Sequence, residues 1–296
     1  MPTSPPRKPE NDELDVFGLT HPGKVRKNNE DQFLIASINK QVQVMSTSLN
    51  DAARLSLRDD RLAFLAMVAD GVGGLDSGEE ASATALEATM RYVTETMDCY
   101  YRGQPTDEHL IDELRAAAMR AHDAITEKRV GEGRRGRMAT TLTMYMGVWP
   151  TYYLVQVGDS RHYVLQNGTL RQISRDQTIA QELLDRGVLS REDAARSPYN
   201  NVLSSALGGD NTEPVITRLD SVWGMVHLLC SDGLTKHVSD AQIHEVLSTM
   251  TSSQQAAEQL LSLALEGGGT DNVTIIVGRT VPKPGRDAPQ SPDAAT

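Results

Sequence analysis

Apolar and polar positions follow two different periods along the chain. Nine short apolar runs have the length and residue types of strands: LDVFGLT, DQFLIAS, LAFLAMVAD, ATTLTMYMGV, TYYLVQVGD, RHYVLQ, PVITRL, GMVHLLCSD and NVTIIVGR. Several of these runs precede two long helical segments and the others follow them, with no alternation of single strands and helices. This order favours antiparallel sheets covered by helices, an α+β fold, over a parallel doubly wound sheet.

Two adjacent segments carry apolar residues at helical spacing. The first, SGEEASATALEATMRYVTETM, has glutamates near its start, which favours a helix that begins at Ser77 or Gly78. The second, DEHLIDELRAAAMRAHDAITEKR, has a similar length. Because the two segments are neighbours in the chain, we expect them to form an antiparallel pair of helices.

Other segments predict connections between these elements. Residues 149–150 and 166–168 lie between strand-sized runs, where hairpin turns are expected. Residues 174–212 predict two short helices in a small lobe beside the sheets, a position suited to gating a substrate. Residues 36–62 lack clean periodicity and predict a long connection with a partial helix.

Length and composition limit the domain organisation. The chain has 296 residues, of which 39% are apolar, and this is enough for one large core. Residues 1–12 and 281–296 are rich in Pro, Ser, Asp and Ala, so we expect two disordered tails. The folded domain is therefore expected at residues 13–280, with the lobe at about 174–212 as a subdomain.

Charge, hydropathy and cysteine content exclude several classes of function. The formal net charge is -11, and Lys and Arg form no run with interleaved aromatic residues, which argues against nucleic acid and membranes as partners. The longest apolar runs are only strand-sized and the first residues lack the apolar core of an export signal, so we expect a cytoplasmic protein. Cys99 and Cys230 are too few for a disulfide framework and form no zinc-type pair.

One apolar run ends in a turn that calls for an explanation. In FLAMVADGVGG, residues 64–74, a strand-like run meets Asp70 and then a glycine-rich stretch. A phosphate-binding P-loop would have Lys and Ser or Thr after the glycines, but Leu75, Asp76 and Ser77 follow here. The turn is therefore not a nucleotide site of that type.

Carboxylates stand at the ends of several predicted strands, and a sheet holds its strand ends rigidly. They are Asp70, Asp159 and Asp232 after a strand, Asp271 directly before one, and Glu30 with Asp31 before another. If they converge, their like charges raise one another's pKa unless cations neutralise them. An all-oxygen cluster suits Mg²⁺ or Mn²⁺, and the lack of His and Cys partners argues against zinc. The glycine that follows Asp70 and Asp232 would let a backbone carbonyl approach a metal ion.

Each of these signals also has a simpler interpretation. Asp-Gly after a strand is usually only a turn. Asp159 could cap a turn or pair with Arg161, and Glu30 with Asp31 could be a solvated strand start. The argument for a metal site therefore depends on the whole ordered set.

Taken in order, eight segments resemble the motif series of the metal-dependent protein serine/threonine phosphatases, the PPM or type 2C family, and most of all its bacterial branch. They are RKNNED, ADGVGG, MATTLT, VGDSR, SRDQT, NVLSSALG, CSDGL and GGTDNVTIIV, and they extend over about residues 14–279. The resemblance implies a four-layer α/β/β/α sandwich of two antiparallel sheets flanked by helices, with metal ions in a cleft at one end. The lobe at 174–212 would be the flap subdomain of the family.

The resemblance also implies which residues hold the metal ions, two Mn²⁺ or Mg²⁺ with a possible third. Asp70 would bridge two ions, and the backbone carbonyl of Gly71 would bind one of them. Asp232 and Asp271 would hold the other ion. Asp159 would join Asp232 around the third, more weakly bound ion.

The remaining roles concern water and the substrate. By the same resemblance, Glu30 and Asp31 would orient water on the ions, and Arg26, the one basic residue expected in the site, would bind the substrate phosphate. Two adjacent ions acidify water, so that a hydroxide can attack phosphorus in line without a covalent phosphoenzyme. Eukaryotic relatives have a histidine as the proposed general acid where this chain has Val72, so we assign no protein general acid. His162, on a predicted strand, is expected to be structural.

Three functions could use this set of residues. The first is hydrolysis of phosphoserine and phosphothreonine in proteins, opposing a Ser/Thr kinase as is common for bacterial members of the family. The alternatives are a non-catalytic scaffold that binds phosphoproteins and a hydrolase of small phosphate esters. We expect phosphoprotein substrates, a kinase and its targets as partners, and a monomer.

Overall fold

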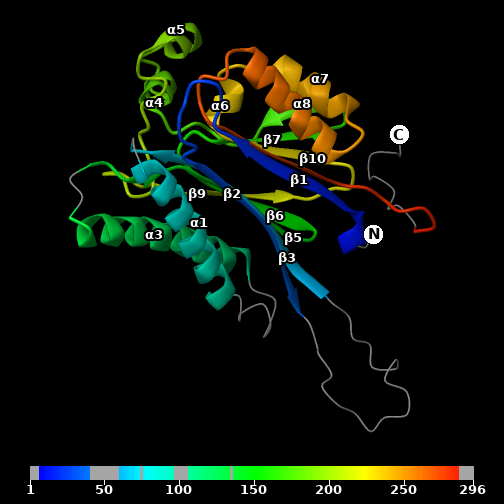
Figure 1. Ribbon diagram of the computed structural model, residues 1–296. Helices are drawn as coiled ribbons and strands as arrows, with labels where there is room; N and C mark the ends of the chain where they lie inside the picture. The colour runs from blue at the N-terminus through cyan, green and yellow to red at the C-terminus, as the bar shows by residue number, and fades with distance from the viewer. Residues whose placement is uncertain (1–6, 41–59, 74–75, 97–105, 134–135, 287–296) are drawn as a thin grey trace.

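Two antiparallel sheets lie face to face at the centre of the structure, a computed structural model that describes residues 7–40, 60–73, 76–96, 106–133 and 136–286 (Figure 1). The first sheet has five strands in the order β1-β11-β10-β7-β8. Their bounds are Leu14–His21 (β1), Val273–Thr280 (β11), Val226–Cys230 (β10), Arg161–Gln166 (β7) and Thr169–Gln172 (β8). All neighbouring strands are antiparallel, which confirms the predicted type of sheet.

The second sheet has six strands, of which β3 is the longest. Its order is β2-β3-β5-β6-β9, and the short β4 pairs with the end of β3. The bounds are Asp31–Lys40 (β2), Asp60–Val72 (β3), Ala139–Thr140 (β4), Leu142–Val148 (β5), Thr151–Val157 (β6) and Val215–Asp220 (β9). Hairpins join β5 to β6 and β7 to β8 at the two places that the sequence predicts.

Helices cover the outer face of each sheet (Figure 1). The six-stranded sheet carries the two predicted long helices, and the five-stranded sheet carries three C-terminal helices. The long helices are α1 (Asp76–Thr96) and α3 (Asp107–Gly131), and the C-terminal helices are α6 (Asp232–Thr235), α7 (Asp240–Thr249) and α8 (Ser253–Glu266). The predicted lobe contains α4 (Ile179–Asp185) and α5 (Arg191–Arg196), and a single 3-10 turn, η1 (Asn11–Glu13), precedes β1. These layers confirm the α/β/β/α sandwich.

Apolar layers hold the helices on the sheets. α3 buries one stripe of residues that recur at intervals of three or four positions. The stripe consists of Leu110, Leu114, Ala117, Ala118, Ala121 and Ile125. The start of α3 is capped by Thr106, whose side chain accepts a hydrogen bond from the backbone N–H of His109. None of the helices in the described part of the chain has the length and apolarity that a membrane span needs.

The segment 36–62, predicted as a connection with a partial helix, is strand at both of its ends. β2 runs to Lys40 and β3 starts at Asp60, and the two strands pair up to these residues with a bulge between Ile38 and Asn39. The prediction was wrong there because the bulge interrupts the alternation of apolar and polar residues that marks a strand. Residues 41–59 lie outside the described residues, so the partial helix stays a prediction.

Parts of both predicted tails pack onto the domain. Arg7 forms an ion pair with Glu13 at 2.7 Å, and its guanidinium lies 4.9 Å from the centre of the Trp223 ring. The indole N–H of Trp223 donates to the backbone carbonyl of Arg7. From the C-terminal segment, the backbone N–H of Val281 donates to the carbonyl of the same Glu13. Described residues of both segments therefore contact the sandwich, while the domain boundaries at positions 13 and 280 stay a prediction.

Between the sheets, four rings form one cluster. His162 and His227 of the five-stranded sheet stack with 3.1 Å between His162 Nε2 and His227 Nδ1. Tyr145 and Tyr152 of the six-stranded sheet pack against His227. Burial disfavours the charged imidazole, so the pKa of His227 falls to about 4 and the pKa of His162 falls well below its ordinary value. This cluster joins the two sheets through neutral rings.

Acid should weaken the fold through the histidine pair. A lowered imidazole pKa means that the unfolded chain binds a proton that the folded chain excludes, so stability is lost as the pH falls from about 6.5 towards 4. From pH 7 to pH 5 we expect the free energy of unfolding to fall by about 2 kcal/mol more in the wild type than in His227→Phe. Urea unfolding at a series of pH values measures this difference.

A matched control is His109→Phe, which changes an exposed histidine on α3. This control should keep the pH dependence of the wild type. If His227→Phe and the wild type show the same pH dependence, the buried pair does not carry the effect.

Candidate active site

Strand pairing brings the predicted carboxylates to one end of the sandwich. In the six-stranded sheet, Asp31 at the start of β2 pairs with Asp70 near the end of β3. In the five-stranded sheet, Cys230 at the end of β10 pairs with Arg161 at the start of β7 and with Ile275 near the start of β11. This places Asp159, Asp232 and Asp271 at a common edge of that sheet. The two sheets therefore present their carboxylates side by side.

A cleft of about 800 Å³ opens at this end of the sandwich. Seven of the eight predicted site residues line it, namely Arg26, Glu30, Asp70, Gly71, Asp159, Asp232 and Asp271. The eighth, Asp31, is buried, with 1% of its surface exposed, and pairs with Asp70 across the strands. The fold thus brings together the residues that the sequence singles out.

Asp31 links the two sheets behind the cleft. Its Oδ2 accepts hydrogen bonds of 2.7 Å from Ser231 Oγ and from Thr274 Oγ1, both of which belong to the five-stranded side. Its Oδ1 is buried without a hydrogen-bond partner among the described residues. Burial raises the pKa of Asp31 to about 7. The hydrogen bonds from the two hydroxyls lower this pKa only in part, and the charges of Asp232 and Asp271 raise it further.

Asp70 and Asp159 lose hydration and face other carboxylates. Desolvation, followed by the charges of Asp31 and Asp232, raises the pKa of Asp70 well above its ordinary value. Desolvation, followed by the charges of Asp232 and Asp176, raises the pKa of Asp159 to about 8. The fold therefore holds these carboxylates close together although they repel one another.

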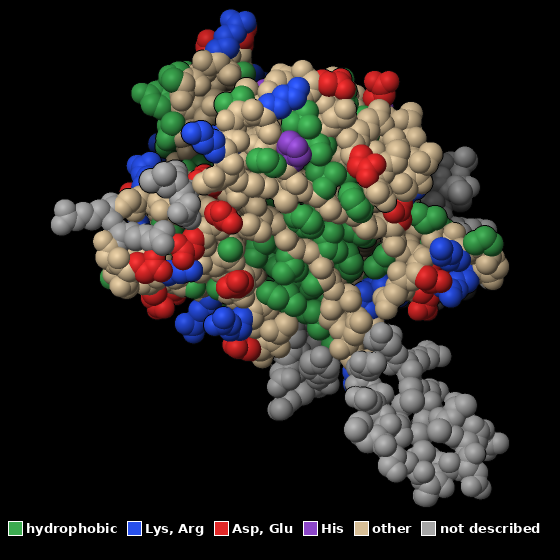
Figure 2. Space-filling model, in the orientation of Figure 1, with side chains coloured by type: hydrophobic (Ala, Val, Ile, Leu, Met, Phe, Trp, Pro, Cys, Tyr) green, Lys and Arg blue, Asp and Glu red, His purple; other side chains and the backbone are tan. Residues whose placement is uncertain are grey.

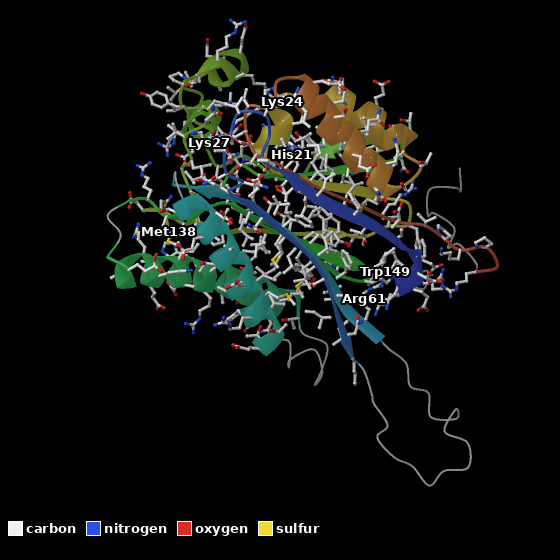
Figure 3. All side chains as sticks on the ribbon, in the orientation of Figure 1. His21, Lys24, Lys27, Arg61, Met138 and Trp149 are labelled. Carbon is white, nitrogen blue, oxygen red and sulfur yellow. The ribbon has the colours of Figure 1, made fainter. Side chains whose placement is uncertain are left out.

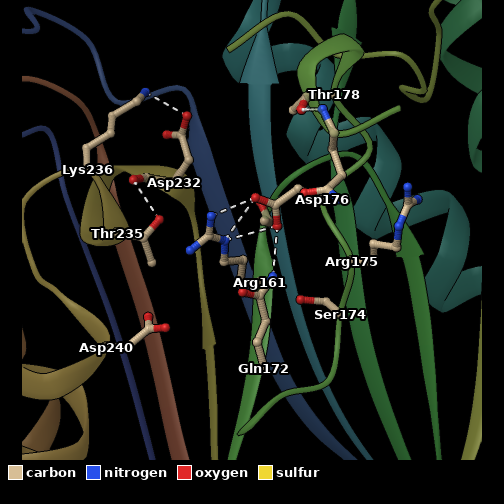
Figure 4. Close-up of polar contacts among 12 residues, drawn as sticks. Arg161, Gln172, Ser174, Arg175, Asp176, Thr178, Asp232, Thr235, Lys236 and Asp240 are labelled. Atoms are coloured by element: carbon tan, nitrogen blue, oxygen red, sulfur yellow. Dashed lines mark hydrogen bonds and ion pairs between the residues drawn. The ribbon is translucent and has the colours of Figure 1, made fainter. Parts of the chain in front are cut away.

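Two cations offset part of this repulsion. Lys236 Nζ lies 2.6 Å from Asp232 Oδ2, a contact drawn in Figure 4, and 2.7 Å from Asp271 Oδ2. Arg26 Nε lies 2.8 Å from Asp271 Oδ1. Desolvation acts against ionised Asp271, but the hydrogen bond and charge of Lys236 and the charge of Arg26 outweigh it, so its pKa lies below the ordinary value. Arg26 is the one basic residue expected here from the sequence, and Lys236 is a second that was not expected.

Asn272 fixes the loop that carries Arg26. Its side-chain amide donates to the carbonyl of Pro22 at 3.0 Å and to the carbonyl of Asn28 at 2.9 Å. Its Oδ1 accepts a hydrogen bond of 2.8 Å from the backbone N–H of Glu30. An amide side chain is needed for this combination of two donors and one acceptor. Sequence reasoning missed Asn272, although its place directly before β11 was a usable signal.

Close backbone packing requires the glycines of both Asp-Gly pairs. A Cβ on Gly71 would lie 2.2 Å from the carbonyl oxygen of Gly78, and a Cβ on Gly233 would lie 1.8 Å from that of Asn272. From the sequence, we expected glycine at these positions because it lets a backbone carbonyl approach a metal ion. The structure adds this steric reason, which holds without any ligand.

The lobe of residues 174–212 forms one wall of the cleft, with Val202 and Leu203 among the residues that line it. Figure 4 shows how the lobe is attached to β7: the Arg161 guanidinium donates three hydrogen bonds of 2.7 to 3.1 Å to the carboxylate of Asp176. Such a bidentate pair fixes orientation as well as distance. The first residues of the lobe are therefore anchored next to the carboxylates.

The donor set fits hard divalent cations in its chemistry and charge. The donors are carboxylates that repel one another, and Asp31 Oδ1 lacks a partner in the described part of the chain. Among the residues that the structure describes, no three His, Cys, Asp or Glu side chains are already arranged as a metal site. Asp232 and Asp271 contact Lys236 and Arg26 instead. To bind a metal ion, Asp232 and Asp271 would have to exchange contacts with these basic side chains for contacts with the ion.

A comparison with known families identifies the relationship. Residues 44–266, well over half of the chain, match the model of the protein phosphatase 2C family. The chain belongs to this family. The resemblance drawn from the eight sequence segments is thereby confirmed, together with the two-sheet fold that it implied.

Phosphatase 2C relatives from bacteria share much of this chain. The serine/threonine protein phosphatase PstP of Mycobacterium tuberculosis is 36% identical over 219 residues, which are 74% of this chain and 41% of PstP. The chain thus spans less than half the length of that relative. The serine/threonine phosphatase stp of Listeria welshimeri is 33% identical over 231 residues, 76% of this chain and 88% of stp.

A solved phosphatase 2C structure has the same fold. It is the catalytic domain of PstP in complex with 2 manganese ions, at 31% identity and a TM-score of 0.69. The match covers 91% of this chain and 99% of that one. The likeness in fold therefore extends over most of this chain.

Neutralising Asp70 should stabilise the metal-free protein. Because its pKa is raised in the folded state, ionised Asp70 opposes folding at pH 8, and this cost vanishes at a pH below its unfolded pKa. We expect Asp70→Asn to raise the free energy of unfolding in chelator at pH 8 by about 2 kcal/mol. Urea unfolding of both proteins measures it.

The control for this experiment is Asp123→Asn, which changes an exposed carboxylate on α3 and should leave stability unchanged. A metal-free Asp70→Asn protein that is no more stable than the wild type at pH 8 would show that desolvation and repulsion at Asp70 do not destabilise the fold.

Removing the side chain of Asn272 should loosen the loop before β2. The Asn272→Ala variant loses all three of its hydrogen bonds to that loop, which contains the trypsin sites Lys24, Arg26 and Lys27. We expect trypsin to cut there about tenfold faster. Limited proteolysis with mass spectrometry of the fragments measures the rate at each site.

Asn211→Ala serves as the control for the loop experiment, since Asn211 makes a comparable amide bond of 2.9 Å to Ser204 within the lobe. It should leave cleavage in the loop at the wild-type rate. Equal rates in all three proteins would mean that other contacts hold the loop.

Proposed function

We propose that this chain hydrolyses phosphoserine and phosphothreonine in proteins, using divalent cations held at the acidic end of the cleft. The observation that carries the proposal is the convergence of strand-end carboxylates from both sheets beside an arginine in one open cleft. The printed names of the relatives, serine/threonine phosphatases, support it. The manganese ions of the PstP complex support the choice of cation.

The metal ions would be held by the residues that the sequence indicates. Asp70, the backbone carbonyl of Gly71, Asp232 and Asp271 would hold two ions, with Asp232 and Asp271 on the same ion. Asp159 would complete a third position with Asp232. Mn²⁺ and Mg²⁺ both suit these oxygen donors. When bound, the ions would supply positive charge and an acidified water for attack on phosphorus.

The chain itself would position the ester and the water. Arg26 is held at the cleft by Asp271 with 53% of its side chain exposed, so its guanidinium is accessible to phosphoryl oxygens. Glu30 lines the cleft and Asp31 lies behind it, where both can accept hydrogen bonds from water. Such preorganised charge stabilises the phosphoryl group as negative charge builds up on its oxygens.

No protein general acid is assigned to the leaving group. Val72, at the position of the histidine in eukaryotic relatives, lines the cleft with 39% of its surface exposed. No histidine is among the cleft-lining residues in the described ranges of the chain. His162 lies in the layer between the sheets, where it contacts His227. Proton transfer to the leaving oxygen is therefore assigned to water.

Exposed apolar side chains beside the carboxylates support a protein substrate over a small ester. Val202, with 44% of its surface exposed, and Leu203 offer apolar contacts on the lobe side of the cleft. A peptide segment that carries the phosphorylated residue would cover these contacts. The substrates would be cytoplasmic targets of a Ser/Thr kinase, and the enzyme would act as a monomer.

Phosphate release from a phosphothreonine peptide tests the proposal. With Mn²⁺ or Mg²⁺ we expect turnover that chelator abolishes and that Asp232→Asn lowers on the order of 100-fold or more, because a buried metal-site carboxylate is lost. Asp220→Asn, in which the replaced side chain is 79% exposed, should keep full activity. Malachite green detection of phosphate gives kcat and KM.

Arg26→Ala should raise KM about tenfold through loss of a charge-assisted contact to phosphate. The control is Arg115→Ala, since Arg115 is 51% exposed and also pairs with an aspartate. No release with any metal would favour the phosphoprotein-binding scaffold. Equal catalytic efficiency on sugar phosphates would favour a hydrolase of small esters.

A further inference from the structure

Lys236 holds together two carboxylates that belong to different elements. It lies one residue beyond α6, four positions after Asp232, and its Nζ is 2.6 Å from Asp232 Oδ2 and 2.7 Å from Asp271 Oδ2 (Figure 4). Its backbone N–H also donates to the carbonyl of Asp232 at 2.9 Å. The helical spacing therefore directs the lysine side chain back over the aspartate that starts the helix.

The ammonium group occupies the position in which a shared cation would make its contacts. Asp232 and Asp271 are the two carboxylates that the proposed function assigns to one divalent ion. The Oδ2 atom of each carboxylate contacts Lys236 Nζ, and only 19% of either aspartate side chain is exposed. A divalent ion that binds both Oδ2 atoms must displace the ammonium group, since two cations in contact with the same oxygens repel each other.

Displacement of Lys236 is sterically simple. Its side chain lines the cleft and is 27% exposed, and a lysine has a flexible four-carbon stem. The carboxylates, by contrast, are fixed by backbone, since Gly233 packs against the carbonyl of Asn272. The lysine can therefore leave while Asp232 stays in place.

We propose that Lys236 is a built-in competitor of the divalent ion at Asp232 and Asp271. It weakens metal binding and stabilises the metal-free protein, so the chain is loaded only when the free ion is abundant. This inference rests on the proposed function in one respect, the assignment of Asp232 and Asp271 to a metal ion. It does not depend on which ester is hydrolysed.

The opposite role for Lys236 makes the opposite prediction. If the lysine only positioned the two carboxylates, its removal would let them move apart and would weaken metal binding. If the lysine competes with the ion, its removal strengthens metal binding for two reasons. The ion no longer has to break the ion pairs of Lys236 with Asp232 and Asp271, and it is no longer repelled by the ammonium group. Metal affinity therefore separates the two roles, whereas activity alone would not.

Isothermal titration calorimetry with MnCl₂ on the purified full chain tests the competition. We expect Lys236→Met to bind Mn²⁺ about three- to tenfold more tightly than the wild type. Lys236→Arg keeps the charge and should bind within about twofold of the wild type. Lys128→Met is the matched control, because it breaks a similar lysine–carboxylate pair of 2.6 Å, to Glu80, and should leave the Mn²⁺ affinity unchanged.

Thermal unfolding provides a second readout that also detects a folding defect. In chelator, Lys236→Met should have a lower melting temperature than the wild type. In saturating Mn²⁺, its melting temperature should equal or exceed that of the wild type. Lys128→Met should change the melting temperature equally with and without metal. If Lys236→Met had a purely structural effect, it would likewise lower the melting temperature equally in chelator and in Mn²⁺.

Equal or weaker Mn²⁺ binding by Lys236→Met overturns the proposal, and so does a failure of wild type and variant alike to bind Mn²⁺. Tighter binding by the variant supports it even if no phosphopeptide is hydrolysed. Failure of the proposed function, seen as metal binding without turnover, is therefore distinguishable from failure of this inference.

Discussion

Repulsion among carboxylates is the interaction on which the rest of the structure depends. Asp31, Asp70 and Asp159 have raised pKa values because the fold removes them from water and places like charges beside them. A loose assembly of loops would relax by moving these groups apart. The ends of paired strands cannot do so without breaking the ladder of backbone hydrogen bonds, which explains why the site lies at the edge of two sheets.

The two sheets are joined at this edge by polar contacts. Asp31 extends from the six-stranded sheet to the hydroxyls of Ser231 and Thr274 on the five-stranded side. Asn272 adds three hydrogen bonds to the loop before β2. Where the carboxylates meet, Lys236 and Arg26 supply positive charge from within the chain. The same edge thus combines rigid strand ends with flexible cationic side chains.

The sequence predicts most of the sandwich and of the acidic cluster, because both depend on local signals. Alternating apolar runs mark the strands, the α3 stripe follows a helical period, and aspartates at strand ends stand out against apolar neighbours. Lys236 has no such contrast, since lysines are common at helix ends, and Asn272 is marked only by its place directly before β11. The contacts of both residues become visible only in the structure, which brings Asp271 beside Lys236 and Asn272 beside the loop that carries Arg26.

Other differences have equally local causes. The bulge at Ile38 hides the end of β2 from a search for alternation. The proline-rich start of the chain lacks the composition of a core segment, yet Arg7 packs on the Trp223 ring. Disorder inferred from composition overlooks such single anchoring contacts. Asp70 lies on one sheet, whereas Asp232 follows a strand of the other sheet and Asp271 precedes one. Sliding one sheet over the other would therefore change the separation of these carboxylates without altering either sheet. The rings of Tyr145, Tyr152, His162 and His227, packed between the sheets, thus help to set a distance between carboxylates that lie at the far edge of both.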